Sequence, residues 1–266
     1  MNCLRTVFWS LLAFTVPLAH PQSLFTKADL DARFATAPQE ITVPESSCCA
    51  IRLQVLDRKP AAREVQNRAD RVLFIRRGHG TITLGSGQSA RKLEVGPQDL
   101  VNVPRGTSLS IDPGKERVET IEVRIFPTEE NRPPRFGALR PMGDVLRSAD
   151  QDALFAKFDT EQSVYVQPHF RVAFVIRKVP SDFESHGCCV DIYLPVHAGS
   201  AHVLLGGTIE NAKERGPGEM RGTGMTGSHA ADIGVGDMIV IRRGGPHYID
   251  PRPGKIGYII VKVQAE

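Results

Sequence analysis

The chain has 266 residues, of which 41% are hydrophobic and 24% are charged, and its formal net charge is +3. This is the composition of an ordinary globular protein, with enough chain for one large domain or two small ones. The small net charge, with no stretch in which basic and aromatic residues are interleaved, argues against a nucleic-acid-binding protein.

The N-terminus has the layout of a secretory signal peptide. Arg5 gives a basic start, TVFWSLLAFTV (6–16) is a short apolar core, and the breaker-rich PLAHPQS follows. The apolar core is shorter than the roughly 20 residues that a membrane helix needs. We therefore expect residues 1–23 to be cleaved near Ala19 to Ser23, leaving an exported chain with no membrane segment. The alternative is an uncleaved N-terminal anchor.

Two related segments predict short helices. KADLDARFA (27–35) and SADQDALFA (148–156) agree at six of nine positions, at an offset of 121 residues. Apolar residues recur in both at helical spacing, and Thr26 or Ser148 is suited to cap the start. A repeat at a fixed offset indicates that the chain contains two copies of one structural unit.

The same offset continues through segments with the pattern of strand, turn and strand. DRVLFIRRGHGTITLG (70–85) aligns with DIYLPVHAGSAHVLLG (191–206), which places Asp70 on Asp191 and a glycine at each bend. Glycine at such a bend is typical of a tight turn between two strands.

A further pair of segments aligns at a larger offset. DLVNVPRGTSLSIDP (99–113) matches DMIVIRRGGPHYIDP (237–251) at an offset of 138, so the second copy contains 17 extra residues in a polar, glycine-rich stretch. Many short strands with Gly and Pro turns predict antiparallel β-barrels. We therefore predict an all-β fold of two tandem jelly-roll barrels, each preceded by a short helix.

These copies define the predicted domains. The N-terminal barrel covers residues 24–127 and the C-terminal barrel residues 146–266, and a linker rich in proline and charge, 128–145, joins them. Tandem copies usually pack as a pseudo-dimer, which buries one sheet edge of each. The sequence leaves open whether the chain also forms a homo-oligomer.

Four cysteines lie beyond the predicted signal peptide, as the adjacent pairs Cys48–Cys49 and Cys188–Cys189. Export permits disulfides. Adjacent cysteines bridge each other only with strain, so a link between the two pairs is the more comfortable chemistry. Buried thiols are the alternative, and the sequence does not choose among the three possible pairings.

The segment GDMIVIRRGGPHYIDP (236–251) resembles the second motif of the cupin superfamily. Gly236, Gly244 and His247 fit that motif, whereas Arg242 stands where proline is usual. The resemblance covers both repeats, and GEMRG (218–222) adds to the similarity to exported tandem cupins of unassigned activity.

The segment ESHGCCVDIYLPVHAG (184–199) resembles a degraded first cupin motif. Glu184 takes the first histidine position, His186 the second and Asp191 the glutamate position, while Gly199 arrives one residue late. The resemblance implies a β-barrel around a small-molecule site. Cupin activities include those of dioxygenases, decarboxylases and sugar isomerases.

These four groups have the spacing of a metal site. Glu184 and His186 are two residues apart and therefore share one face of a strand, Asp191 follows a turn, and His247 comes from a distant strand. Two imidazoles and one or two carboxylates suit Zn²⁺, Mn²⁺, Fe²⁺ or Ni²⁺, and two histidines with one carboxylate form the facial triad of non-haem iron oxygenases.

Other interpretations remain open. His247 could hydrogen-bond within its turn, and Asp191 could serve a turn or a strand end, because Asp70 occupies the aligned place in the first copy. Tyr193 and His197 share strand parity with Asp191, so either could line the same pocket as a proton-transferring group.

In the first copy the positions aligned with Glu184, His186 and His247 are Arg63, Val65 and Leu109. These three side chains do not bind divalent cations. We therefore expect the first barrel to have an apolar interior without metal, and a single metal site in the second barrel.

Three functions are compatible with this pattern. The first is an exported tandem cupin with one metal site that acts on a small polar molecule such as a sugar or an organic acid. The second is a non-catalytic module that binds such a ligand. The third is a structural role in which the metal holds the barrel together.

Overall fold

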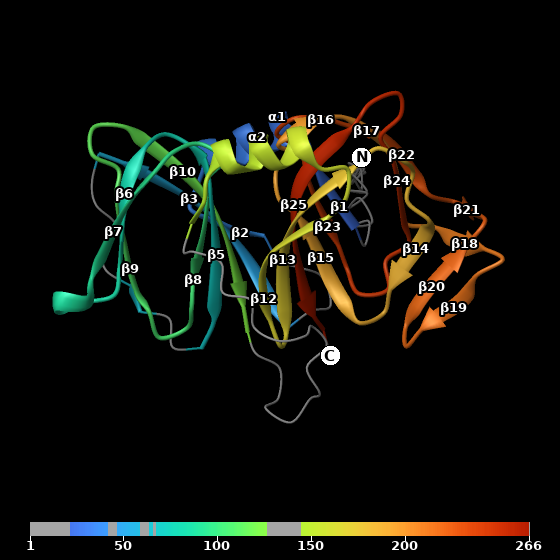
Figure 1. Cartoon of the computed structure of the whole chain (residues 1–266), viewed down its shortest axis with the longest axis horizontal. Coiled ribbons are helices and arrows are strands. Elements are labelled where there is room, and N and C mark those ends of the chain that lie inside the picture. The colour runs from blue at the N-terminus through green and yellow to red at the C-terminus, as the bar shows by residue number, and fades with distance from the viewer. Residues whose placement is uncertain (1–21, 42–46, 59–63, 66–67, 127–144, 266) are drawn as a thin grey trace, which may run out of the picture.

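The computed structural model describes residues 22–41, 47–58, 64–65, 68–126 and 145–265. Two antiparallel β-barrels lie side by side, and helices α1 (Lys27–Ala35) and α2 (Ser148–Lys157) lie together over one end of the pair (Figure 1). The predicted all-β fold with two tandem barrels is confirmed. Residues 1–21 of the predicted signal peptide and 128–144 of the predicted linker fall outside the described residues, whereas Gln22 and Ser23 lie in a strand.

The first barrel is built from two sheets. The larger has the order β11-β8-β5-β10-β3-β2, and the smaller has the order β4-β9-β6-β7. A short 3₁₀ helix, η1 (Gly87–Ser89), connects β6 to β7. The strands are β2 (Gln39–Ile41), β3 (Cys49–Asp57), β4 (Glu64–Val65), β5 (Asp70–Arg77), β6 (Gly80–Leu84), β7 (Arg91–Val95), β8 (Leu100–Val103), β9 (Ser108–Asp112), β10 (Arg117–Ile125) and β11 (Val145–Leu146).

The second barrel repeats this plan. One sheet has the order β1-β23-β15-β25-β13-β12, with β16 added beside β25, and the other has the order β19-β20-β14-β24-β17-β22. The strands are β1 (Gln22–Phe25), β12 (Gln162–Gln167), β13 (Phe170–Arg177), β14 (Phe183–His186), β15 (Cys189–Tyr193), β16 (Ala198–Gly199), β17 (Ala201–Leu205), β22 (His229–Ile233), β23 (Met238–Ile241), β24 (His247–Asp250) and β25 (Ile256–Gln264).

The glycine-rich insertion of the second copy folds into four further strands beside the second barrel (Figure 1). Strand β20 (Glu219–Gly222) pairs with β14 and with β19 (Lys213–Gly216), which extends one sheet of the barrel. Strands β18 (Thr208–Glu210) and β21 (Gly224–Thr226) pair with each other. The insertion therefore covers the edge of the strand that carries Glu184 and His186.

The two barrels exchange their leading strands. Strand β1, which precedes α1, pairs with β23 of the second barrel, and β11, which precedes α2, pairs with β8 of the first. One apolar core runs between the facing sheets and includes Phe34 of α1 with Phe74 and Phe174. Each side chain of this size contributes about 1.5–3 kcal/mol when fully buried. The pair is therefore held by a shared core as well as by backbone pairing.

Each helix begins on an aspartate of the opposite barrel. The backbone N–H of Lys27 donates to Asp237 at 2.6 Å, and that of Ser148 donates to Asp99 at 2.8 Å. Thr26 caps α1 as expected, because its hydroxyl accepts from the Asp29 N–H at 3.1 Å. Ser148 was expected to cap α2 but is its first helical residue, since Asp99 supplies the acceptor.

The predicted turn glycines are required where the chain bends. Gly78 and Gly199 have φ of 79° and 77°, a region that favours glycine. A Cβ at Gly199 would lie 1.8 Å from the carbonyl oxygen of Lys255, and one at Gly78 would lie 2.2 Å from that of Arg117. Any larger residue would push the neighbouring strand away at both bends.

Candidate metal centre

Three of the predicted ligands converge in the second barrel. Glu184, His186 and His247 each present one ligand atom, and these atoms lie within 4.8 Å of one another. The strands bring them together, because Glu184 and His186 project from the same face of β14 and Glu184 lies directly opposite His247 on β24. Long-range pairing of β14 with β24 thus joins the two motifs.

Both histidines direct one nitrogen inward. The Nδ1 of His247 lies 3.0 Å from the carbonyl oxygen of Gly245, and the Nδ1 of His186 is hydrogen-bonded to the Glu219 carboxylate. An acceptor at Nδ1 holds the proton there and leaves the Nε2 lone pair for a metal. The Nε2 of His247 lies 3.8 Å from Glu184 Oε1, and the Nε2 of His186 lies 3.7 Å from Asp191 Oδ2.

Burial favours the neutral, metal-binding form of His247. Its side chain is 2% exposed, and burial, together with the neighbouring His186, lowers the pKa of His247 below its usual value. The side chains of Glu184 and His186 are each 13% exposed. The cluster is therefore deep enough to exclude bulk water but open on the side of β14.

Asp191 borders the cluster without belonging to the group of three. It is 1% exposed, its Oδ2 lies 3.5 Å from Lys262 Nζ, and neither of its oxygens has a hydrogen-bond partner in the part of the chain that the structure describes. The carboxylate faces His186 on one side and an ammonium group on the other. It thus lies beside one of the three candidate ligands and carries an ion pair of its own.

Tyr193 lies next to the cluster, as predicted. Its ring is edge-on to His247, with centroids 6.4 Å apart, and to Tyr258, with centroids 4.9 Å apart. Burial raises the pKa of Tyr193 well above its usual value, so its hydroxyl keeps its proton near neutral pH. Arg177 hydrogen-bonds to Tyr258, and its positive charge acts on Tyr193 as well. One wall of the site therefore carries a guanidinium and two phenols.

His197 does not join this wall, so the prediction that it lines the same pocket is wrong. Its Nε2 lies 2.8 Å from Asp152 of α2, and its ring lies edge-on against Phe174. Strand β15 ends at Tyr193, and the chain turns before it reaches β16. The alternation that gave His197 the parity of Asp191 is therefore lost in between.

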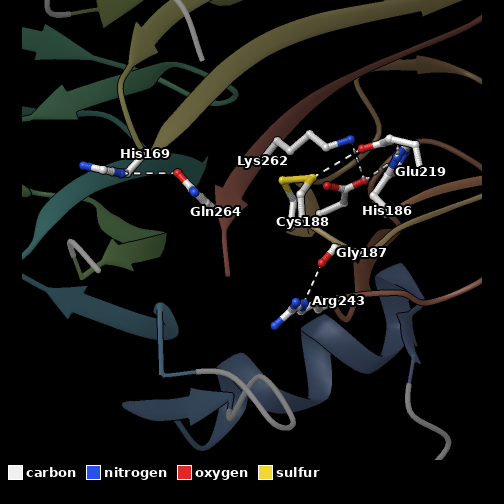
Figure 2. The surroundings of a disulfide bond; sticks show 10 residues. His169, His186, Gly187, Cys188, Glu219, Arg243, Lys262 and Gln264 are labelled. Carbon is white, nitrogen blue, oxygen red and sulfur yellow. Dashed lines mark hydrogen bonds and ion pairs between the residues drawn. A yellow bond between two sulfur atoms is a disulfide. The ribbon is translucent and has the colours of Figure 1, made fainter. Parts of the chain in front are cut away.

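The cysteines pair differently from the expected link between the two pairs. Cys188 and Cys189 form a disulfide with each other. The sulfur atoms of Cys48 and Cys49 lie 3.7 Å apart, and both residues are buried in the shared core. Figure 2 shows the Cys188 sulfur facing Glu219, whose carboxylate also faces His186.

Glu219 is the part of the site that sequence reasoning missed. It lies in GEMRG, within the insertion, and pairs directly with His186 across β20 and β14. A carboxylate beside a candidate histidine ligand is a common partner for the second ring nitrogen. The sequence signals for it were the resemblance of GEMRG to exported tandem cupins and an acidic residue between glycines in an otherwise polar segment.

Strand register corrects the alignment of the first barrel. Glu64 lies opposite Leu109 there, in the place that Glu184 has opposite His247. Glu64 therefore corresponds to Glu184 by position. Arg63, the residue matched by sequence, falls outside the described residues.

The aligned aspartates do not correspond either. Asp191 pairs with Ile241 and Lys262, and the first-barrel residue in that frame is Arg71, which pairs with Val103 and Arg124. Asp70 is therefore no control for Asp191, and a guanidinium stands where the second barrel has a carboxylate.

The sequence analysis predicted an apolar interior for the first barrel. That prediction is wrong in part, because charged side chains are buried there. Arg71 is 1% exposed and Glu122 is 3% exposed, with Arg71 Nη1 3.8 Å from Glu122 Oε1. Arg124 Nε lies 3.2 Å from Glu122 Oε2. An apolar cluster that includes Leu73, Ile75 and Leu109 occupies the remaining interior.

No protein-family model matches the sequence, and no curated protein matches it. Solved structures do. A variant of salicylate 1,2-dioxygenase from Pseudoaminobacter salicylatoxidans superimposes with a TM-score of 0.65 over 91% of this chain and 83% of that chain, at 11% identity. A cupin 2 conserved barrel domain protein from Leptotrichia buccalis gives 0.55 over 85% and 88%, at 10% identity.

Oxalate decarboxylase from Bacillus subtilis, a protein with Mn(II) centres, gives a TM-score of 0.51 over 85% of this chain and 72% of that chain, at 13% identity. This chain has the tandem cupin fold. In a cupin barrel of this kind the candidate metal centre is formed by the three groups of the second barrel, Glu184, His186 and His247. The part of the chain that the structure describes holds no helix long and apolar enough to span a membrane.

Proposed function

We propose that this tandem cupin is a metal-dependent enzyme that acts on a small organic acid at a single site in the second barrel. Glu184, His186 and His247 hold the metal, which is Zn²⁺, Mn²⁺, Fe²⁺ or Ni²⁺. Asp191 is the remaining candidate ligand, next to His186. The observation that carries the proposal is the convergence of these three donors within 4.8 Å.

The donor set fits a divalent transition metal. Each imidazole has its Nδ1 engaged by an acceptor outside the cluster, by Gly245 for His247 and by Glu219 for His186. Such outer partners orient histidine ligands and raise their basicity. Two histidines and one carboxylate leave coordination positions open for a substrate.

The wall beside the cluster supports an acid as the substrate. Arg177 lies among Tyr193, Tyr258 and Glu184, and its buried Nε has no hydrogen-bond partner in the described chain. A guanidinium pairs with a carboxylate through directed hydrogen bonds. Salicylate and oxalate, the substrates in the names of two structural neighbours, are both small organic acids.

The chain's own residues divide the chemistry. A bound divalent metal supplies Lewis-acid polarisation of a substrate oxygen. Arg177 orients the acid, and Tyr193 holds a proton at its hydroxyl because its pKa is raised. Tyr193 can therefore donate a hydrogen bond to negative charge that develops on the substrate. His197 has no part in this, because it is bonded to Asp152 on α2.

A second candidate is a non-catalytic module that binds the same class of ligand. Glu184 stands where a cupin histidine is usual and is itself engaged by Arg221, with Nη2 3.8 Å from Oε2. That ion pair draws charge away from the candidate ligand and would weaken a catalytic metal. A purely structural metal is the third possibility.

Metal content separates these functions. We expect about one equivalent of a transition metal in the natively purified protein, lost in His247→Ala and kept in Leu109→Ala, the matched position of the first barrel. Bound iron that oxidises in air would favour an oxygenase, whereas zinc that resists chelation would favour the structural role. Protein without metal, or with two equivalents, would contradict the proposal.

We also propose that the chain is exported after cleavage of its N-terminal segment. Strand β1 begins at Gln22, and Gln22 and Ser23 pair with Ile241 and Val240. A cut ahead of Gln22 keeps this strand whole, whereas a cut after Ser23 removes half of it. N-terminal sequencing of the secreted protein tests the proposal, and a mature chain that begins within residues 19–22 is expected.

A further inference from the structure

The vicinal disulfide lies next to the candidate metal centre. Cys188 follows His186 by two residues, and its sulfur lies 3.4 Å from Glu219 Oε1 (Figure 2). The other oxygen of the same carboxylate, Oε2, is hydrogen-bonded to His186 Nδ1. One carboxylate thus connects a disulfide sulfur to the ring of a candidate metal ligand.

The backbone around this contact is held in place. Gly187, between His186 and Cys188, donates its N–H to the Gly218 carbonyl at 2.6 Å, and Arg243 Nε donates to the Gly187 carbonyl at 2.5 Å. A Cβ at Gly187 would lie 2.8 Å from the Gly218 oxygen. Because the two strands are in such close contact, a chemical change at Cys188 acts on the Glu219 side chain before it moves the backbone.

The redox state of Cys188 determines whether a hydrogen-bond donor lies beside the Glu219 carboxylate. A disulfide sulfur carries no hydrogen, so in the oxidised protein it donates nothing to the carboxylate. A thiol is a weak donor. Reduction therefore places an S–H beside Oε1, and that donor withdraws charge from the carboxylate that accepts from His186.

We propose that Cys188–Cys189 is a redox-active modification site that tunes the metal affinity of His186 through Glu219. The reductant is a dithiol. The Cys188–Cys189 S–S bond breaks and two S–H groups form, while the donor loses two S–H hydrogens and forms its own S–S bond. Two electrons and two protons are transferred. Partially exposed Cys188 is the sulfur that the donor attacks, since Cys189 is 1% exposed.

The direction of the effect follows from the role of Glu219. A strong acceptor at Nδ1 makes the opposite nitrogen of His186 a better ligand. Reduction weakens that acceptor, so the reduced protein binds metal less tightly. Complete loss of such an outer partner costs about 10–100-fold in metal affinity, and an added weak donor belongs at or below the lower end of that range.

The inference rests on the proposed function, because it concerns a metal held by His186. The test compares full-length protein in two states, oxidised, and reduced with a small dithiol that is then removed under nitrogen. Alkylation and mass spectrometry first verify that reduction adds Cys188 and Cys189 to the modified cysteines. Calorimetric titration with Mn²⁺ and with Zn²⁺ then gives the affinity of each state.

We expect the reduced state to bind up to about tenfold more weakly. Cys48→Ala/Cys49→Ala, which keeps the disulfide, should retain this difference. Cys188→Ala/Cys189→Ala should bind equally in both states. Glu219→Gln should bind more weakly than wild type and lose the redox dependence.

The possible failures are distinguishable. Metal that binds in neither state overturns the proposed function. Metal that binds equally to both states, with reduction verified, overturns the redox inference alone. Tighter binding after reduction also overturns it, because it would mean that the thiols themselves coordinate the metal. The wild-type comparison needs no variant, so a variant that fails to fold leaves the test intact.

Discussion

The two barrels use one arrangement of strands for two different interiors. Positions matched by register carry Glu184, Asp191 and Lys262 in the second barrel and Glu64, Arg71 and Arg124 in the first. The most informative difference is the exchange of a carboxylate for a guanidinium. Where the second barrel has a carboxylate beside its candidate ligands, the first has a guanidinium.

Charge at the matched positions explains the difference. The first barrel also has Glu122 where the second has Ile260, so its matched positions carry Arg71 and Arg124 with Glu64 and Glu122, and Arg52 adds a third guanidinium 3.6 Å from Glu64. The matched positions of the second barrel carry two carboxylates, Glu184 and Asp191, and one lysine, Lys262, beside the two imidazoles. Carboxylates beside imidazoles suit a metal ion, whereas the guanidinium of Arg71 occupies the place of Asp191 in the first barrel.

Placing the first-barrel charge in the second barrel should have the largest effect. Asp191→Arg puts a guanidinium beside His186 Nε2, which Asp191 approaches at 3.7 Å. We expect metal affinity to fall by more than about 100-fold, because a like charge within a few ångströms opposes the ion. Calorimetric titration with Mn²⁺ measures this. Asp191→Asn, which only removes the charge, should lose less, and equal losses in both variants would contradict the argument.

Disrupting the ion pairs inside the first barrel should lower the stability of the protein without lowering its metal content. Arg71→Met removes one of the two guanidinium groups beside the buried Glu122 and leaves Arg124 Nε at 3.2 Å, so the loss should lie below the roughly 3–5 kcal/mol that breaking a whole buried ion pair costs. Denaturant unfolding measures the loss. Arg71→Met/Glu122→Ile, which copies the residue that the second barrel has at Ile260, should recover most of it. A double variant as unstable as the single one would show that Arg71 acts through packing and not through its charge.

The aspartates that hold the helices allow a finer comparison. Asp99 accepts from Ser148 N–H at 2.8 Å and from Arg147 Nη1 at 2.9 Å, whereas Asp237 accepts from Lys27 N–H at 2.6 Å. Loss of a cap costs about 0.5–2 kcal/mol, so Asp99→Ala should fall at the upper end and Asp237→Ala at the lower. Thermal unfolding of both variants ranks them. The reverse order would show that the contact between Arg147 and Asp99 adds nothing to stability.

Much of the fold could be predicted from the sequence because it depends on local pattern. The first helix has the predicted bounds, and the second extends one residue beyond them, to Lys157. The pairing of Glu184 with His247 follows from strand alternation within two recognisable motifs. Glu219 and the vicinal disulfide did not follow, because the first depends on how an insertion folds back and the second on a choice among three pairings.

The misplaced Asp70 shows how similarity can mislead at a single position. Phe74, opposite β10, and Leu194, opposite β25, occupy the same place in the two barrels. Ile75 corresponds to Val196, so Pro195 is one extra residue in the second barrel. A register shift between Glu119 and Thr120 lies beside this point in the first barrel. A bulge of this kind changes the residue count without changing the hydrophobic pattern, so sequence alone cannot locate it.

The smallest expected effect is a difference in the pH dependence of stability between the wild type, with His247, and a variant that has leucine there, as the first barrel has at Leu109. Burial, and then the neighbouring His186, holds the pKa of His247 in the folded protein below the value of 6.5 of the free side chain. Between these two values the unfolded chain binds a proton that the folded chain does not, so the stability of the metal-free protein falls as pH drops below about 6.5. In His247→Leu, which installs the first-barrel residue, this part of the decline disappears. Melting temperatures of chelator-treated wild type and variant between pH 7.5 and pH 5 test it, and parallel curves would mean that His247 binds protons equally in the folded and unfolded chain, so that burial does not favour its neutral form.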